Sequence, residues 1–166
     1  MMRNPVAWLV VGAALSPGLA HAHWQYTKWG MTPLQVQTAA KGNLSPAGSQ
    51  DMCGACASAP LLTGGYSVGG QNFRVSFEFE AGKSLSGVVL ATPSTRQTWG
   101  CSDLFDSLSQ KYGAPVWHAP LTGDGTLPGT RWLDQRDDNV VFFNDASQQT
   151  GLCEIRYSPL VTGKGL

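Results

Sequence analysis

The sequence predicts an α+β domain, in which helices pack on one face of a mostly antiparallel sheet. Apolar and polar residues alternate from Phe73 to Phe79, with the two-residue period of a half-buried strand. Two stretches with helical signals, one opening at residue 33 and one ending at residue 112, are each followed by consecutive strand patterns. Runs of consecutive strands favour antiparallel pairing with the helices on one face. We therefore expect two halves, each a helix followed by antiparallel strands.

The N-terminal 22 residues have the pattern of a signal peptide. Arg3 precedes a short apolar run from Val6 to Leu15, and Ala20-His21-Ala22 is a small-x-small cleavage site. The run is shorter than the roughly 20 apolar residues that a bilayer span needs. We expect a mature chain that begins at His23 in the periplasm or outside the cell. It would form a single domain, 23–166, with pseudo-repeat halves at about 23–92 and 93–160.

The charges argue against nucleic acid as a partner. The chain carries 11 Lys and Arg against 11 Asp and Glu, interspersed rather than gathered in blocks. A basic stripe of the kind that binds a phosphate backbone is not seen in the sequence. No second long apolar run follows the first, so no membrane span is expected. The sequence calls for no cofactor, and the expected partner is another protein in the envelope or outside the cell.

The first helix is expected from Pro33 to Lys41. Thr32 is a suitable N-cap, and proline at the first helical position loses no hydrogen bond. Gln35 stands three residues after Thr32 and completes a capping box. Gly42 ends the pattern in the usual way.

The rest of the first half predicts a loop and three strands. The loop runs from Asn43 to Pro60 and is rich in small residues. The strands cover Leu61 to Val68, Phe73 to Phe79 and Leu85 to Leu90, with Gly69-Gly70 as the tight turn between the first two.

The second half predicts a helix and three or four strands. Leu104, Phe105, Leu108 and Tyr112 recur at helical spacing, with Thr95 or Ser102 as the N-cap and Gly113 at the end. The strand patterns that follow are Val116 to His118, Thr130 to Leu133, Val140 to Asn144 and Leu152 to Ser158.

Four cysteines behind a signal peptide indicate two disulfides. They stand at positions 53, 56, 101 and 153, and the sequence allows three pairings. We predict Cys53–Cys56 and Cys101–Cys153, of which the second would tie the second helix to the last strand.

Two motifs leave an enzymatic or metal-binding alternative open. Cys53 and Cys56 have the C-x-x-C spacing of thiol–disulfide exchange proteins, although they lie in a small-residue loop rather than at the start of a helix. An N-terminal His23 offers an amine and an imidazole to copper, and His118 would add a third nitrogen.

Two further motifs are better explained as turns or strand ends. Gly65-Tyr66-Ser67-Val68-Gly69 matches the G-x-S-x-G string of hydrolases, but that motif needs a helix after it and here a strand follows. Asp134, Asp137, Asp138 and Asn139 gather oxygens without the spacing of a calcium loop, which indicates a hairpin turn.

The segment Trp29-Gly30-Met31-Thr32-Pro33-Leu34-Gln35-Val36 resembles the helix-opening motif of small bacterial envelope proteins related to BamE and to the β-lactamase inhibitor protein. The resemblance implies tandem helix-plus-sheet units and a sheet face that grips a protein partner. The chain lacks the lipid-bearing cysteine of BamE-type proteins, so the resemblance does not imply a membrane tether.

These features together predict a non-catalytic protein-binding module of the inhibitor or immunity kind. Its surface would be the sheet face away from the helices, with binding residues Arg74, Ser76, Glu78, Glu80, Glu154 and Arg156. The alternatives are a redox protein that uses Cys53 and Cys56, a copper protein that uses His23 and His118, and a structural component of the envelope.

Overall fold

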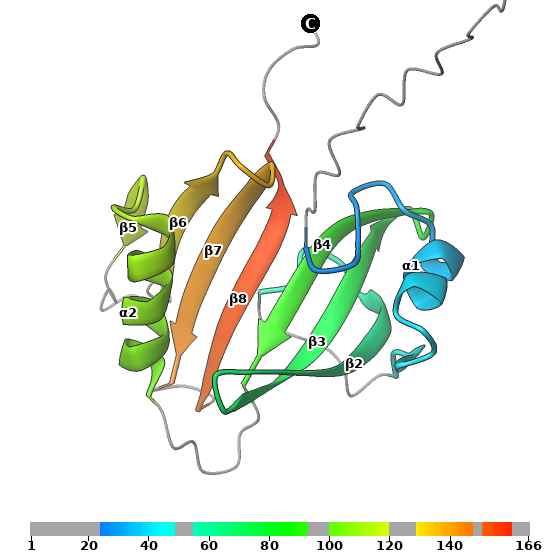
Figure 1. Ribbon diagram of the computed structural model, residues 1–166, viewed down its shortest axis with the longest axis horizontal. Helices are drawn as coiled ribbons and strands as arrows, with labels where there is room; N and C mark the ends of the chain where they lie inside the picture. Colours follow the sequence, from blue (N-terminus) through cyan, green and yellow to red (C-terminus); the bar gives the residue numbers. More distant parts are fainter. Residues whose placement is uncertain (1–23, 49–54, 93–99, 120–128, 148–150, 161–166) are drawn as a thin grey trace, which may run out of the picture.

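One antiparallel sheet of eight strands dominates the computed structural model, which describes residues 24–48, 55–92, 100–119, 129–147 and 151–160 (Figure 1). The order across the sheet is β1-β2-β3-β4-β8-β7-β6-β5. The elements in chain order are α1 (Pro33–Ala39), β1 (Leu44–Pro46), β2 (Pro60–Val68), β3 (Gln71–Glu80), β4 (Ser84–Ala91), α2 (Cys101–Tyr112), β5 (Trp117–Ala119), β6 (Gly129–Asp134), β7 (Asn139–Ala146) and β8 (Leu152–Pro159).

The predicted fold class is wrong. Each strand pattern of the sequence does form a strand, but the strands of the two halves join into one sheet rather than two helix-plus-sheet units. The join is antiparallel pairing of β4 with β8, from Val88 opposite Tyr157 to Ala91 opposite Glu154. The backbone amides and carbonyls at the facing edges of β4 and β8 form hydrogen bonds with one another and are thereby satisfied. The two helices, of 7 and 12 residues, are minor parts of this sheet protein.

The capping box predicted for α1 is confirmed. The Gln35 amide donates to Thr32 Oγ1 at 3.3 Å, and the Thr32 amide donates to Gln35 Oε1 at 2.9 Å. The helix ends at Ala39, two residues before the expected Lys41. It is followed by Lys41 and Gly42 with positive φ angles of 53° and 78°, which end the helical hydrogen bonding.

The second helix begins at Cys101, with Gly100 as its N-cap. The Gly100 amide donates to Asp103 Oδ2 at 3.0 Å, so a carboxylate satisfies the amide of the N-cap residue. Ser102 lies inside the helix, and Thr95 lies outside the described residues. Gly113, with a φ of 78°, ends the helix as expected.

Both helices lie on the same face of the sheet, near its opposite ends (Figure 1). The core between them and the sheet includes the fully buried Val36, Phe77, Val88, Trp132 and Val141. The alternation predicted along β3 is confirmed on this face, where its phenylalanines and Val75 are buried.

The predicted disulfide between Cys101 and Cys153 is present, with the Cα atoms 5.5 Å apart. It ties the first residue of α2 to β8. Cys56 is also disulfide-bonded, and Cys53 lies outside the described residues, so the pairing of these two stays a prediction. The described residues include no helix with the length and apolar character of a membrane span.

Candidate functional site

The six residues predicted to bind a partner do share one face of the sheet, but half of them are not accessible. Ser76, Glu78 and Glu154 are only 2%, 0% and 2% exposed. Arg156 is partly buried, and Arg74 and Glu80 are exposed. The exposure expected for this face is therefore wrong at three positions, and only part of the predicted set is available to a partner.

The buried Glu78 forms an ion pair with the partly buried Arg156. Arg156 Nη2 lies 2.8 Å and Arg156 Nε lies 3.0 Å from Glu78 Oε2, and the Ser58 amide donates to Glu78 Oε1 at 2.7 Å. Gly87 faces this pair from β4, where an added Cβ would collide with Glu78 Oε2 and lie 2.8 Å from Arg156 Nη2. A glycine in the middle of a strand often marks such a close approach. This network links β3, β8 and the backbone at Ser58.

The structure does not test the copper alternative, because one of its two histidines lies outside the described residues. His118 lies exposed on β5, with Nδ1 2.7 Å from Thr130 Oγ1, and His23 lies outside the described residues. Within the described ranges, no group of three His, Cys, Asp or Glu side chains is placed to hold a metal ion. Ser67 of the G-x-S-x-G string donates to Asn72 Oδ1 at 2.6 Å within the β2–β3 hairpin, where a strand follows as expected.

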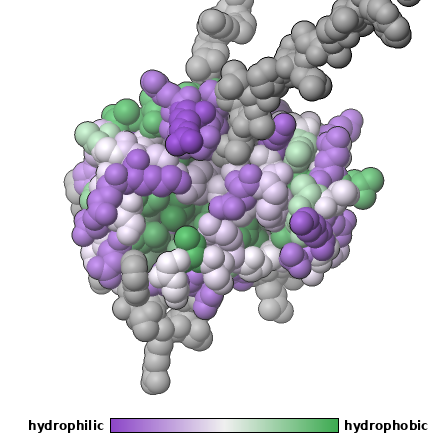
Figure 2. Space-filling view, viewed as in Figure 1, coloured by the Kyte–Doolittle hydropathy of each residue, from purple (hydrophilic) through white to green (hydrophobic). Residues whose placement is uncertain are grey.

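A groove lies on the helix side of the sheet, between α2 and the residues around Trp24. We call it the α2 groove; Figure 2 shows apolar atoms exposed in the middle of this face, bordered by polar ones. It consists of two adjoining hollows of about 220 and about 400 Å³ that share Val68, Phe73, Leu104 and Ser107.

One wall of the α2 groove is a single stripe of α2. The lining residues Leu104, Ser107, Leu108, Lys111 and Tyr112 recur at helical spacing on one helix face. The opposite wall comes from Trp24, Gln25 and Tyr66. The Trp24 and Tyr66 rings meet edge to face at 5.5 Å, and Gln25 Nε2 donates to Tyr66 Oη at 2.8 Å. The floor consists of Phe73, Leu90, Ile155 and Tyr157 from β3, β4 and β8.

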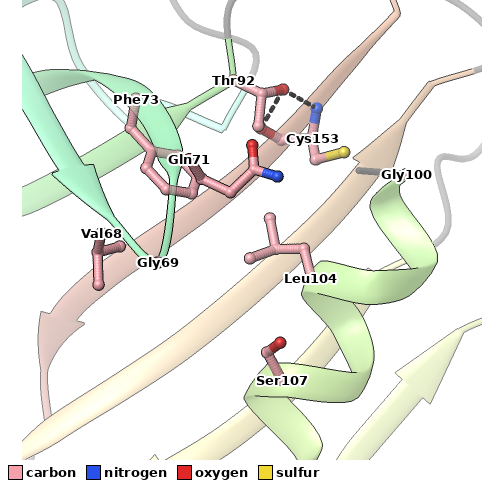
Figure 3. A pocket seen from close by; sticks show the side chains of 9 residues that line it. All are labelled: Val68, Gly69, Gln71, Phe73, Thr92, Gly100, Leu104, Ser107 and Cys153. Atoms are coloured by element: carbon pink, nitrogen blue, oxygen red, sulfur yellow. Dashed lines mark hydrogen bonds between the residues drawn. The ribbon is translucent and has the colours of Figure 1, made fainter. Parts of the chain in front are cut away.

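The smaller hollow, which we call the inner end, is almost entirely apolar but contains one donor that no described residue pairs. Val68, Phe73 and Leu104 supply apolar side chains to it, and Thr92 and Cys153 lie at its base (Figure 3). The Thr92 hydroxyl is occupied, because it donates to the Cys153 carbonyl and accepts from the Cys153 amide. Gln71 Nε2 is buried and has no acceptor among the described residues. Figure 3 shows its amide turned toward the space between Leu104 and Cys153.

The larger hollow, which we call the outer end, carries charges. Its lining residues include Asp134, Asp137, Asn139 and Lys111, together with Tyr112 and Tyr157. Tyr112 Oη donates to Tyr157 Oη at 3.5 Å. Burial raises the pKa of Tyr112, and the nearby carboxylates of Asp134 and Asp137 raise it further against the opposing effect of that hydrogen bond. The carboxylates of Asp134 and Asp137 are therefore close enough to the Tyr112 hydroxyl to disfavour its ionisation.

The buried Tyr157 hydroxyl predicts a loss of stability in alkali. Burial, and then the neighbouring Tyr112, raises the pKa of Tyr157 above its ordinary value of 10.0. The folded protein holds this proton more tightly than the unfolded chain, so the stabilisation is complete below about pH 10 and is lost as the pH rises above that value. In Tyr157→Phe, the free energy of unfolding should fall less steeply above pH 10, by up to about 1.4 kcal/mol per pH unit. Urea unfolding between about pH 8 and pH 11 would measure this slope. An unchanged alkaline slope in the variant would contradict the assignment.

Sequence reasoning missed the α2 groove, although it identified the helix that lines it. The spacing of Leu104, Leu108 and Tyr112 was a sound helical signal, but such a stripe normally indicates core packing. Leu108 is indeed buried, whereas Leu104 and Tyr112 are only partly buried.

No protein-family model matches the chain, and a search of curated proteins and of solved structures finds no match either.

Proposed function

We propose that this protein is a non-catalytic binding module of the periplasm or the extracellular space, and that it holds an extended segment of a partner protein in the α2 groove. The observation that carries the proposal is the pair of adjoining hollows along one face of α2, of which the larger is bounded on its other side by Trp24 and Tyr66 and has mostly apolar side chains as its floor. Exposed apolar surface in a concave setting is typical of ligand and protein interaction sites.

The dimensions of the α2 groove suit a short extended peptide. The 12 residues of α2 span about 18 Å at 1.5 Å per residue. An extended chain advances about 3.3 Å per residue, so about five residues would fit alongside the helix. The outer hollow, at about 400 Å³, lies within the usual size range of binding pockets. The floor residues would supply affinity through burial of apolar area.

The location in an oxidising compartment is supported by two features. Cys101 and Cys153 form a disulfide, which persists in exported proteins and is rare in the reducing cytosol. The N-terminal residues, with Arg3, the short apolar run and Ala20-His21-Ala22, have the pattern of an export signal.

A tryptophan placed in the α2 groove should abolish peptide capture. Ser107 is exposed and lines both hollows, so the indole of Ser107→Trp would fill the space that they share without disturbing the core. Phage-displayed random heptapeptides selected on the exported protein should yield binders, and their affinity for Ser107→Trp should fall at least tenfold, about 1.4 kcal/mol. Titration calorimetry with synthetic copies of the enriched peptides would measure the change.

Gln110→Trp is the matched control. Gln110 is exposed on the same helix, does not line either hollow and is also uncharged. Peptides should bind this variant as they bind the wild-type protein. Selection that enriches nothing, or peptides that bind Ser107→Trp with undiminished affinity, would contradict the proposed function.

A further inference from the structure

The two ends of the α2 groove differ in chemistry, and together they define the class of peptide. Resting on the proposed function, we infer that the groove selects segments in which a Lys or Arg side chain occupies the outer end and an apolar residue occupies the inner end. Gln71 would then donate to a backbone carbonyl of that apolar residue.

The inner end calls for an occupant that is apolar but carries an acceptor. Val68, Phe73 and Leu104 offer no hydrogen bonds through their side chains, while Gln71 Nε2 is a buried donor without an acceptor among the described residues. Buried donors in native proteins are nearly always paired, so a carbonyl oxygen from a ligand fits this position. A hydrocarbon chain would cover Gln71 Nε2 further and leave it unpaired. A peptide supplies both an apolar side chain and a carbonyl.

The outer end calls for a positive charge. Asp134 and Asp137 are half-buried on the rim and carry two carboxylates, against the single ammonium group of Lys111. Lys111 Nζ lies 4.7 Å from the centroid of the Tyr112 ring, where the ring face already attracts it. The remaining carboxylate excess favours a guanidinium or ammonium group of the occupant and repels acidic segments.

The length of α2 between the two ends sets the spacing of the two residues. Leu104 is the apolar α2 side chain that reaches the inner end, although it also borders the outer hollow, and Lys111 lines the outer end, seven residues along the helix. Seven residues correspond to about 10 Å of helix, or about three residues of extended chain. The basic and apolar residues of the peptide should therefore stand about three positions apart.

Charge neutralisation on both sides of the contact tests the inference. In peptides selected on the wild-type protein, replacing the Lys or Arg by Gln should weaken binding at least tenfold. The Asp134→Asn/Asp137→Asn variant should bind the basic peptide and its Gln counterpart with the same affinity. Asp106→Asn, on an exposed α2 position outside both hollows, should still discriminate between them. Gln71→Met should weaken both peptides several-fold without changing the ratio of their affinities.

Three outcomes would overturn the inference. Selected peptides that lose affinity for Ser107→Trp but contain no basic residue, or that tolerate Gln in its place, would refute the charge preference while leaving the proposed function intact. Self-association of the wild-type protein that Ser107→Trp abolishes would assign the groove to a second copy of the chain. A selection that enriches no peptide at all would overturn the proposed function together with the inference.

Discussion

Arg156→Met is expected to lower the free energy of unfolding at pH 7 by about 3–5 kcal/mol, the usual cost of leaving one charge of a buried pair without its partner. Glu78 is 0% exposed and receives both Arg156 Nη2 and Nε on Oε2. Among the described residues, the Ser58 amide would remain as a hydrogen-bond donor to the carboxylate. Urea unfolding monitored by circular dichroism would measure the loss.

The double variant Glu78→Leu/Arg156→Met separates the charge effect from packing. Replacing both members of a buried pair by apolar side chains is often nearly neutral, so the double variant should recover much of the stability that Arg156→Met loses. Arg131→Met is the control for loss of an arginine on the same sheet, because Arg131 is exposed over the Trp117 ring; it should cost at most about 1 kcal/mol. A loss for Arg156→Met no larger than that of the control would refute the importance of the pair.

Removal of the Cys101–Cys153 disulfide is expected to cost about 4 kcal/mol. The two residues are separated by 52 positions, and opening a loop of that length gives the unfolded chain a corresponding gain in entropy. Alanine suits both positions, because the two sulfurs are buried and a serine hydroxyl would need a partner there. Urea unfolding of Cys101→Ala/Cys153→Ala and of the oxidised wild-type protein, compared at the same pH, would measure the difference. Equal midpoints and equal slopes would contradict the expectation.

Local signals in the sequence predicted the elements, because each signal depends on residues close together in the chain. The capping box of Thr32 and Gln35, the alternation along β3 and the glycine after α2 all belong to this class. Pairing of β4 with β8 depends on residues more than 60 positions apart. The periodicity of the sequence does not indicate which strand edges pair with each other, so the single eight-stranded sheet could not be predicted from local patterns.

The burial of Glu78 escaped prediction for a related reason. Alternation assigns Glu78 to the face opposite Phe77, and that assignment is right. The alternation does not indicate that the Ser58 backbone and Arg156 contact Glu78 on that face and bury it. The available signal was Gly87, a glycine inside an apolar strand pattern, which indicates a close approach by another group. The α2 groove required the positions of helix and sheet relative to each other, which no local pattern contains.

Because β4 pairs with β8, the order of synthesis leaves one edge of the sheet without its neighbouring strand for a time. Synthesis proceeds from the N-terminus, so the meander β1 to β4 is complete while β8 has yet to emerge. During that interval the β4 edge has no neighbouring strand, and its unpaired amides and carbonyls can pair with a strand of another chain. Closure then awaits a contact of long sequence separation, which is slow to form. A nascent chain arrested between residues 92 and 152 should therefore be the species most prone to aggregate, and the one that a holding chaperone protects.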